Sequence, residues 1–307
     1  MMMKRLLSLL LALCLFFSLP SCIQLELPDT GETSSLQINS GLDVPAGSSF
    51  VIHFIDVGQA DAALVLCDGM SMLIDGGNAD DSNLIYNYLR KQGITHLNYI
   101  VSTHAHEDHV GGLSGALTAA TVGKVYSPVT SFSTKAFKNF VKKVEAQGKK
   151  LTVPTPGETF SLGSATVTIL GPVKSDYEDV NDTSIVLRIV FGETSFLFTG
   201  DMEREAENDL ILSGAVLQST VLKVGHHGSR SSTSYVFLRQ VAPKYAVIPV
   251  GKDNSYGHPT EEVLSRLRDA EVEVLRTDMQ GDILCVSDGK KVTFTTAKHP
   301  TSPTNPT

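Results

Sequence analysis

The six residues from His104 to His109, HAHEDH, include three histidines, one glutamate and one aspartate. Imidazole nitrogens and carboxylate oxygens are common protein ligands of divalent metals. His104 and His106 stand two apart at the end of an apolar run that predicts a strand, and Asp108 and His109 follow in the turn. This spacing predicts side chains that face two neighbouring cations, whereas the simpler alternative is a solvated polar loop.

Three other predicted strands end in residues of the same kind. Asp75 ends the run MLID, Asp201 follows FLFTG, and His226 and His227 follow LKVG. Taken separately, they have simpler explanations: a turn residue, a helix N-cap and a polar loop. Together, the four strand ends supply metal ligands or groups that support them, which is how a site is built on a rigid sheet.

The elements that must position these residues follow from the apolar patterns. Strands are predicted at 48–58, 62–69, 70–77, 96–103, 165–170, 184–190, 194–200, 219–225, 244–250, 272–277, 282–287 and 291–296. Helices are predicted at 81–93, 133–148, 202–214, 234–241 and 260–270. Along the chain, a stretch made mostly of strands is followed by a stretch in which strands and helices alternate, and this order occurs twice. We therefore expect an α/β fold, a four-layer αββα sandwich of two sheets with helices outside.

The first residues have the features of a secretory signal. Lys4 and Arg5 precede an apolar run, residues 6–19, that is shorter than the about 20 residues a membrane-spanning helix needs. The run ends in LPSC, which resembles a bacterial lipoprotein box. We therefore expect a signal peptide at 1–21, lipid on Cys22 and an extracytoplasmic, membrane-anchored protein. The alternatives are an ordinary signal peptide, which would release a secreted protein, and an uncleaved anchor.

The rest of the chain divides by composition. Residues 22–49 are rich in Ser, Gly, Pro and Thr and predict a flexible linker. Residues 50–297 predict the folded domain, and residues 298–307, with three prolines, predict a disordered tail. Cys67 and Cys285 are the cysteines of the domain, and both a disulfide and two buried free thiols remain open.

The charge of the chain bears on its partners. Its formal net charge is −8, or −10 once Lys4 and Arg5 leave with the signal, so bulk charge does not attract nucleic acid. The predicted helix at 133–148 differs, because it and the next two residues carry a single acid, Glu145, against six lysines: Lys135, Lys138, Lys142, Lys143, Lys149 and Lys150. A solvated helix face is the simpler explanation, but beside an active site this face would contact a DNA backbone.

Taken as a group, the motifs resemble a known family. HAHEDHVGG, LIDGG, FLFTGD and GHHGS resemble the metal-binding motifs of the metallo-β-lactamase-fold hydrolases. FIDVGQADAALV, NDTSIVLRI, LKVGHHGSRSST and NSYGHP narrow the resemblance to the C-terminal hydrolase domain of the ComEC competence DNA-uptake channels, from Phe50 to Thr296. We expect that hydrolase domain alone, on a lipid anchor and without the transmembrane channel.

The resemblance implies two divalent ions, zinc or manganese, and a set of ligands. His104 and His106 would bind the first ion, Asp108, His109 and His226 the second, and Asp201 would bridge both. We choose His226 over His227 because it directly follows the predicted strand, although the register leaves both open.

The resemblance also implies supporting residues and shows one departure. Asp75 would hold a ligand imidazole by its ring N–H, and Asp56 and Asp61 would support or border the site. Most of the wider superfamily supplies a further histidine to the first ion, where this chain has Asn181 and Asp182. An oxygen ligand there, or none, makes manganese a competitor of zinc, because oxygen donors suit harder cations.

The implied chemistry is hydrolysis by a hydroxide that two metal ions activate. On a phosphodiester, with Asp108 among the catalytic ligands, His227 and His258 would donate a proton or contact the phosphate. Loop packing is the alternative for these two histidines. Ser229 and Arg230, directly after the second histidine pair, would bind phosphate.

We therefore expect a phosphodiesterase or nuclease acting outside the cytoplasm. The alternatives are another ester hydrolase, such as a phosphocholine esterase, and a catalytically weak lipid-anchored accessory or binding protein. A true β-lactamase is the least expected, because a shared fold does not determine the substrate. Nothing in the sequence indicates an obligate protein partner.

Overall fold

The computed structural model describes residues 50–306. The predicted signal peptide at 1–21, the lipid-bearing Cys22 and the linker at 22–49 lie outside the described residues and stay predictions. Across residues 50–306, no helix is both long enough and apolar enough to cross a membrane.

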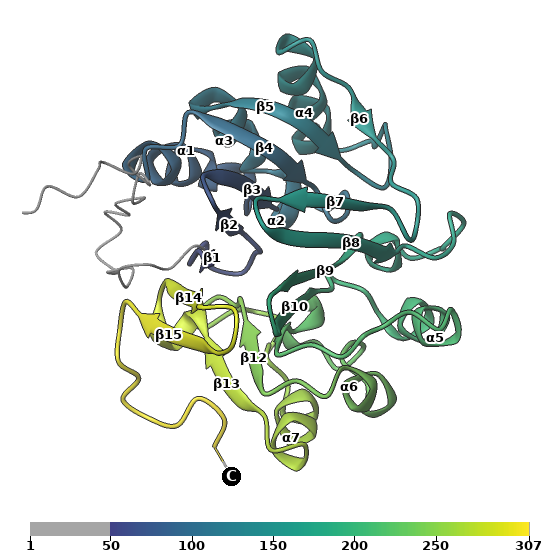
Figure 1. Ribbon diagram of the computed structural model, residues 1–307, viewed down its shortest axis with the longest axis vertical. Helices are drawn as coiled ribbons and strands as arrows, with labels where there is room; N and C mark the ends of the chain where they lie inside the picture. Colours follow the sequence, from purple (N-terminus) through teal and green to yellow (C-terminus); the bar gives the residue numbers. More distant parts are fainter. Residues whose placement is uncertain (1–49, 307) are drawn as a thin grey trace, which may run out of the picture. The chain divides into compact units, whose positions relative to one another are not determined.

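The first sheet has eight strands (Figure 1). In spatial order they are β15 (Val292–Thr296), β14 (Ile283–Ser287), β1 (Phe50–Phe54), β2 (Ala63–Cys67), β3 (Met70–Ile74), β4 (His96–Val101), β5 (Thr121–Tyr126) and β6 (Leu151–Thr152). The strands from β15 to β3 pair antiparallel, and those from β3 to β6 pair parallel.

The second sheet has seven strands. They are β13 (Glu273–Arg276), β12 (Tyr245–Ile248), β11 (Val221–Lys223), β10 (Thr194–Phe198), β9 (Val186–Phe191), β8 (Ala165–Gly171) and β7 (Thr159–Leu162). Here β10 to β13 run parallel, while β7 to β10 pair antiparallel.

The helices lie outside the two sheets (Figure 1). On the first sheet they are α1 (Ser82–Lys91), α2 (Glu107–Val110), α3 (Leu113–Ala119) and α4 (Lys135–Ala146). Those of the second half of the chain are α5 (Arg204–Leu212), α6 (Tyr235–Val241), α7 (Glu261–Asp269) and the short α8 (Thr277–Gln280).

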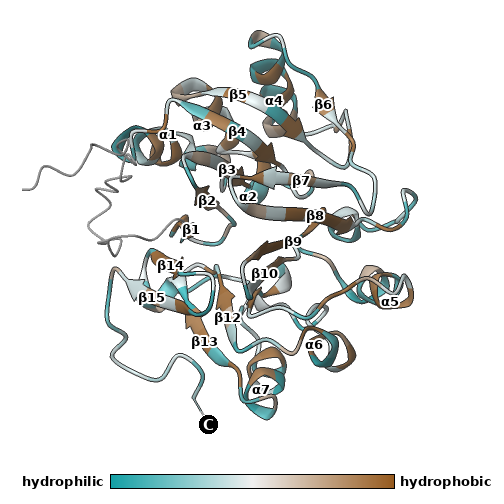
Figure 2. Ribbon diagram, viewed as in Figure 1, coloured by the Kyte–Doolittle hydropathy of each residue, from teal (hydrophilic) through white to brown (hydrophobic). Residues whose placement is uncertain are grey.

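Alternation along the strands explains the layers. In β1, Phe50, Ile52 and Phe54 belong to the apolar core between the sheets, while Val51 and the following Ile55 belong to the core under α1, α3 and α4. A third core joins the second sheet to α5, α6 and α7. The apolar character of β8, β9 and β13 is visible in Figure 2. The predicted αββα sandwich is therefore confirmed.

Parallel pairing brings the predicted site residues to one edge. Neighbouring parallel strands end at the same edge of a sheet, and β3 pairs parallel with β4, as β10 does with β11. Asp75 follows β3, His104 follows β4, Asp201 follows β10, and the pair His226 and His227 follows β11.

Two glycines fix α2 against the end of β3. A Cβ atom at Gly112 would lie 1.9 Å from the backbone oxygen of Gly76, and one at Gly111 would lie 2.2 Å from the amide nitrogen of Ala79. Both glycines have right-handed helical angles, so close approach of the backbone, and not an unusual turn, requires them here.

The two domain cysteines are free and buried. Cys67 lies on β2 and Cys285 on β14, and β1 separates these strands, so the disulfide alternative does not hold.

The C-terminal segment, predicted as a disordered tail, makes hydrogen bonds to the domain. Asn305 accepts a hydrogen bond from Arg268 at 2.8 Å and donates one to the carbonyl oxygen of Leu264 at 3.1 Å. Thr304 donates to the carbonyl oxygen of Val274 at 2.6 Å. A search for apolar patterns does not detect this segment, because hydrogen bonds of polar groups, and not apolar side chains, hold it against α7 and β13.

Candidate metal centre

The first histidines of the HAHEDH segment lie together at the end of β4. His104 is fully buried, and its Nε2 is 3.1 Å from Nδ1 of His106. His106 precedes α2 as its N-cap residue, so the helix that follows carries Asp108 and His109. The rings of His104 and His109 have centroids 4.1 Å apart. The segment therefore delivers its imidazoles to one place, as the spacing predicted.

Asp201 joins this segment to the second sheet. Its Oδ2 lies 3.2 Å from Nε2 of His109 and 3.5 Å from Nε2 of His227. Asp108 completes the group, with its Oδ2 3.3 Å from Nε2 of His227 and 3.8 Å from Nε2 of His109. These four residues each offer one ligand atom, and all four atoms lie within 4.8 Å of one another.

The spacing of these atoms fits a metal ion. Ligand atoms 2.0–2.1 Å from a tetrahedral ion lie about 3.3 Å from one another. The four distances from the carboxylate oxygens of Asp108 and Asp201 to Nε2 of His109 and His227 bracket that value, running from 3.2 to 3.8 Å. Two ring nitrogens with two carboxylate oxygens are a donor set that suits zinc and also manganese.

The structure favours His227 over His226 as the ligand. His227 is 1% exposed, and its Nδ1 lies 3.0 Å from the carbonyl oxygen of Pro249, so that its Nε2 faces the cluster. His226 is less buried; its Nδ1 lies 3.0 Å from Glu203, and its Nε2 is 3.8 Å from Oδ2 of Asp201. Both histidines have positive φ angles, of 49° and 52°. The chain therefore turns sharply after β11, and the second ring rather than the first points inward.

Asp75 and Asp61 flank the ligand rings. Asp75 accepts hydrogen bonds from the backbone and side chain of Thr103, both at 2.7 Å, and its Oδ2 lies 2.9 Å from Nδ1 of His109. Asp61 places Oδ1 3.3 Å from Nδ1 of His227. Each carboxylate thus contacts Nδ1 of an imidazole whose Nε2 faces the candidate cluster, the position from which a carboxylate would orient a ligand ring.

Asp56, in contrast, is not part of the site. Its carboxylate accepts from the amide of Gly58 at 3.3 Å and lies 3.8 Å from Nζ of Lys298. Its own amide donates to Asp282 at 2.8 Å. Asp56 therefore stabilises the turn after β1, and its place in the DVGQAD motif gives it no contact with the ligands.

The two polar residues that stand where the superfamily has a histidine differ in role. Asp182 accepts from the amides of Glu203 at 2.8 Å and Ala206 at 3.4 Å, and so caps α5. Asn181 is 7% exposed, and its Oδ1 is buried with no hydrogen-bond partner among the described residues. A buried oxygen without a partner is costly, so Asn181 is the one with an oxygen free for a ligand.

The remaining predicted residues lie near the second histidine pair. His258 places its ring edge-on to His226, with centroids 5.6 Å apart. Burial, together with His226 and His227, lowers the pKa of His258 to about 4, so its ring is neutral at neutral pH. The hydroxyl of Ser229 bonds that of Ser231 at 2.8 Å, and Arg230 is exposed beside them.

The charges of the cluster favour cations. Burial lowers the pKa of His109, but Asp201, Asp75 and Asp108 outweigh it and raise that pKa well above its usual value. Burial raises the pKa of Asp201, but His109 and His227 together hold it well below its usual value. Without metal, protons on the rings therefore balance the carboxylates, and a bound ion would displace them.

Two residues escaped the sequence analysis. Lys223, the last residue of β11, is a buried cation beside Asp61 and Asp201. Glu203, two residues after Asp201, accepts from Ser231 at 2.8 Å and contacts His226. The sequence does contain a sign of Lys223: it is a charged residue inside the apolar run STVLKVG, directly before the histidine pair.

The choice between the two histidines is testable. His227→Ala should weaken binding of Mn²⁺ or Zn²⁺ by more than about 100-fold, because a direct ligand should matter more than the about 10- to 100-fold typical of a group that only orients one. His226→Ala should weaken metal binding by no more than that about 10- to 100-fold range. Calorimetric titration of the metal-free protein measures both affinities, and a larger loss for His226→Ala would reverse the assignment.

Comparison with known proteins places this site in a family. Residues 55–252 match the family described as the metallo-beta-lactamase superfamily. The chain is 30% identical to ComE operon protein 3 of Bacillus subtilis (strain 168) over 250 residues, covering 76% of this chain and 32% of that protein. It is 33% identical to competence protein ComA of Neisseria gonorrhoeae over 228 residues, covering 74% and 30%. The chain thus spans about a third of the length of these curated relatives.

Solved structures agree on the fold. The metallo-beta-lactamase fold protein YhfI from Bacillus subtilis superposes with a TM-score of 0.53 at 13% identity, covering 78% of this chain and 100% of that one. At that identity the likeness supports the fold alone. With the sequence match over most of the domain, it shows that this chain belongs to the metallo-β-lactamase superfamily of metal-dependent hydrolases and is related to bacterial competence proteins.

Proposed function

We propose that this protein is a two-metal phosphodiesterase, with DNA as its substrate. The observation that carries this proposal is a groove that runs from the metal-binding segment to α4. Glu107 and Gly111, on either side of the ligands Asp108 and His109, line it together with three lysines of α4: Lys135, Lys138 and Lys142. The predicted basic helix face thus shares a groove with the short helix α2, which carries Asp108 and His109, and a phosphate backbone bound along this groove would be led toward the metal centre.

The residues of the chain divide the work of such a reaction. His104, His106, Asp108, His109, Asp201 and His227 would hold the ions, with Asn181 offering a further oxygen. Bound ions would polarise the phosphoryl oxygens and lower the pKa of an attacking water. His258, neutral and at the rim, would donate a hydrogen bond to a phosphate or leaving-group oxygen.

An exposed aromatic ring extends the rim. Tyr256 is 70% exposed and stacks on His258 with ring centroids 5.6 Å apart. Aromatic side chains of this kind provide stacking surfaces for unpaired bases. The lysine groove and this ring together support a nucleotide polymer over a small phosphate ester.

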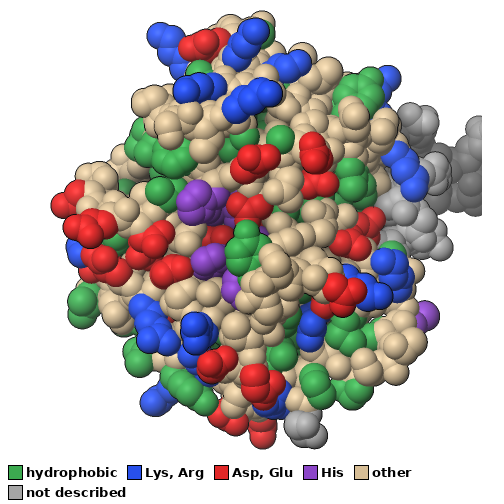
Figure 3. Space-filling model, turned by 180° about the vertical axis from the view of Figure 1, so that it is seen from behind, with side chains coloured by type: hydrophobic (Ala, Val, Ile, Leu, Met, Phe, Trp, Pro, Cys, Tyr) green, Lys and Arg blue, Asp and Glu red, His purple; other side chains and the backbone are tan. Residues whose placement is uncertain are grey.

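A second candidate, a phosphocholine esterase, is favoured by a different observation. A second groove beside Glu203 is lined by mostly acidic residues: Glu178, Asp179, Asp182, Glu203, Glu205, Arg204, Arg230 and Ser231. On the face in Figure 3, histidines reach the surface between acidic and basic side chains. Acidic residues would attract a cationic head group and repel a polyanion, so the two grooves point to different substrates.

A panel of substrates separates the candidates. The purified protein with Mn²⁺ or Zn²⁺ should hydrolyse single-stranded DNA, duplex DNA or bis-p-nitrophenyl phosphate faster than p-nitrophenylphosphocholine, and should leave a β-lactam intact. His106→Ala and Asp201→Ala should abolish the activity, because each removes a metal ligand. Turnover that survives both substitutions would exclude this site, and no metal-dependent turnover on any substrate would favour an accessory role.

The lysine groove makes its own prediction. Lys138→Glu combined with Lys142→Glu should raise KM for DNA and reduce the slope of log affinity against log salt by about 1 to 2, since each phosphate contact contributes about 0.7 to 0.9. Hydrolysis of bis-p-nitrophenyl phosphate should be unchanged. Lys149→Glu with Lys150→Glu, beyond the end of α4, is the matched control. An equal effect in the control would remove the groove from the proposal.

We also propose that the protein is anchored outside the cytoplasm through lipid on Cys22. The support is the LPSC sequence after an apolar run. Cys22→Ala should shift the protein out of the membrane fraction, because it removes the thiol that is predicted to carry the lipid. Fractionation followed by immunoblotting measures this, and a variant that stays fully membrane-bound would favour an uncleaved anchor.

A further inference from the structure

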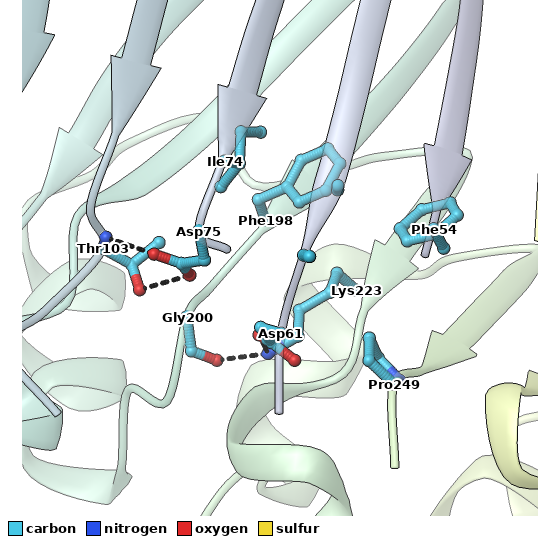
Figure 4. A pocket seen from close by; sticks show the side chains of 11 residues that line it. Phe54, Asp61, Ile74, Asp75, Thr103, Phe198, Gly200, Lys223 and Pro249 are labelled. Carbon is cyan, nitrogen blue, oxygen red and sulfur yellow. Dashed lines mark hydrogen bonds and ion pairs between the residues drawn. The ribbon is translucent and has the colours of Figure 1, made fainter. Parts of the chain in front are cut away.

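Lys223 occupies an unusual position behind the metal pocket. Its side chain is 4% exposed, and Nζ donates to the carbonyl oxygen of Gly200 at 2.8 Å. The same Nζ forms an ion pair with Asp61 and lies 3.7 Å from Oδ1 of Asp201 (Figure 4 shows its contacts with Asp61 and Gly200). A buried ammonium is retained only where partners compensate for lost water, and here two carboxylates and one carbonyl do so.

The two carboxylate oxygens of Asp201 face different partners, and Lys223 lies on the side of only one of them. Oδ2 faces the ligand rings, at 3.2 Å from His109 and 3.5 Å from His227. Oδ1 is buried without a hydrogen bond, and Lys223 is the cation on its side. Attraction between Nζ and Oδ1 therefore holds the carboxylate in the orientation that presents Oδ2 to the metal pocket.

The same charge restrains Asp61. Asp61, Asp75 and His109 place ligand atoms close enough together to hold an ion themselves. The ammonium of Lys223 already supplies a positive charge beside Asp61, on the side of the ligand rings away from Asp108. An extra ion there would bind Nδ1 of His109, which faces Asp75. It would then compete for this ring with the pocket on the other side, where Nε2 faces Asp201.

We propose that Lys223 is a positioning residue: a fixed internal cation that orients Asp201 through Oδ1 and keeps Asp61 out of the set of metal ligands. This inference concerns the metal centre and does not depend on which ester the protein hydrolyses. It goes beyond the proposed function, because it says that a side chain, and not only the bound metal ions, supplies positive charge to the carboxylates of the site.

The test measures metal binding rather than turnover. In the full chain, Lys223→Met should weaken the binding of Mn²⁺ and of Zn²⁺ by about 10- to 100-fold, the range for loss of a group that orients a ligand. Lys244→Met, the same change at an exposed lysine before β12, should leave affinity unchanged. Unchanged affinity in Lys223→Met, with a loss only in stability against denaturant, would show a merely structural role and overturn the inference.

A double variant separates the two carboxylates and remains informative if the single variant does not fold. Asp61→Asn with Lys223→Met removes both partners of the buried ion pair, so the metal-free protein should regain stability. Its metal affinity should nevertheless stay about 10-fold or more below that of Asp61→Asn alone, because Asp201 still lacks its cation. Equal affinities in these two variants would overturn the role assigned to Lys223 at Asp201.

Discussion

The site depends on the contacts that the carboxylate of Asp201 makes with imidazoles from both halves of the fold. Asp201 follows β10 in the second sheet, yet its Oδ2 lies within 3.2 Å of His109, which belongs to a helix packed on the first sheet. On its own sheet it lies 3.5 Å from His227. The sandwich can therefore present one set of ligands only while its two sheets keep their register at this edge.

Contacts around Asp201 maintain that register. The amide of Ile185 donates to the carbonyl oxygen of Thr103 at 2.8 Å, and Ser184 accepts from the amide of Asp201 at 3.0 Å. The segment before β9 is thus bonded both to the end of β4 and to the end of β10. The apolar core between the sheets supplies the stability, while these few polar bonds set the alignment to the precision that a metal site needs.

The second constraint is electrostatic. Asp61, Asp75 and Asp201 are all buried in one place, and like charges at such distances cannot remain without compensation. Lys223 and the imidazoles of His109 and His227 supply part of the positive charge, and bound divalent ions would supply the rest. A site of this composition attracts anionic substrates only when its ions are present, which is consistent with an acidic domain whose proposed substrate is a phosphodiester.

The sequence by itself determined the fold class and predicted which strand ends carry the candidate metal ligands. Apolar runs, each followed by Asp or His, predict strands whose ends meet, and the motifs carry His104, His106, Asp108, His109 and Asp201 with them. The placement of these residues follows from local patterns: a strand ends where its pattern ends, and the next residue lies at the sheet edge.

The tertiary structure decided what local patterns do not contain. Two left-handed residues after β11 turn His227 inward in place of His226, and the carbonyl of Pro249, a strand away, fixes its ring. Asp56 and Asp61 share one motif, yet only Asp61 reaches the ligands, because the turn between them directs their side chains apart. Lys223 has the sequence context of an ordinary strand residue, and only the fold brings Asp61 and Asp201, distant in sequence, beside its ammonium. The role of a buried charge depends on its neighbours in space, and those follow from the packing of the two sheets.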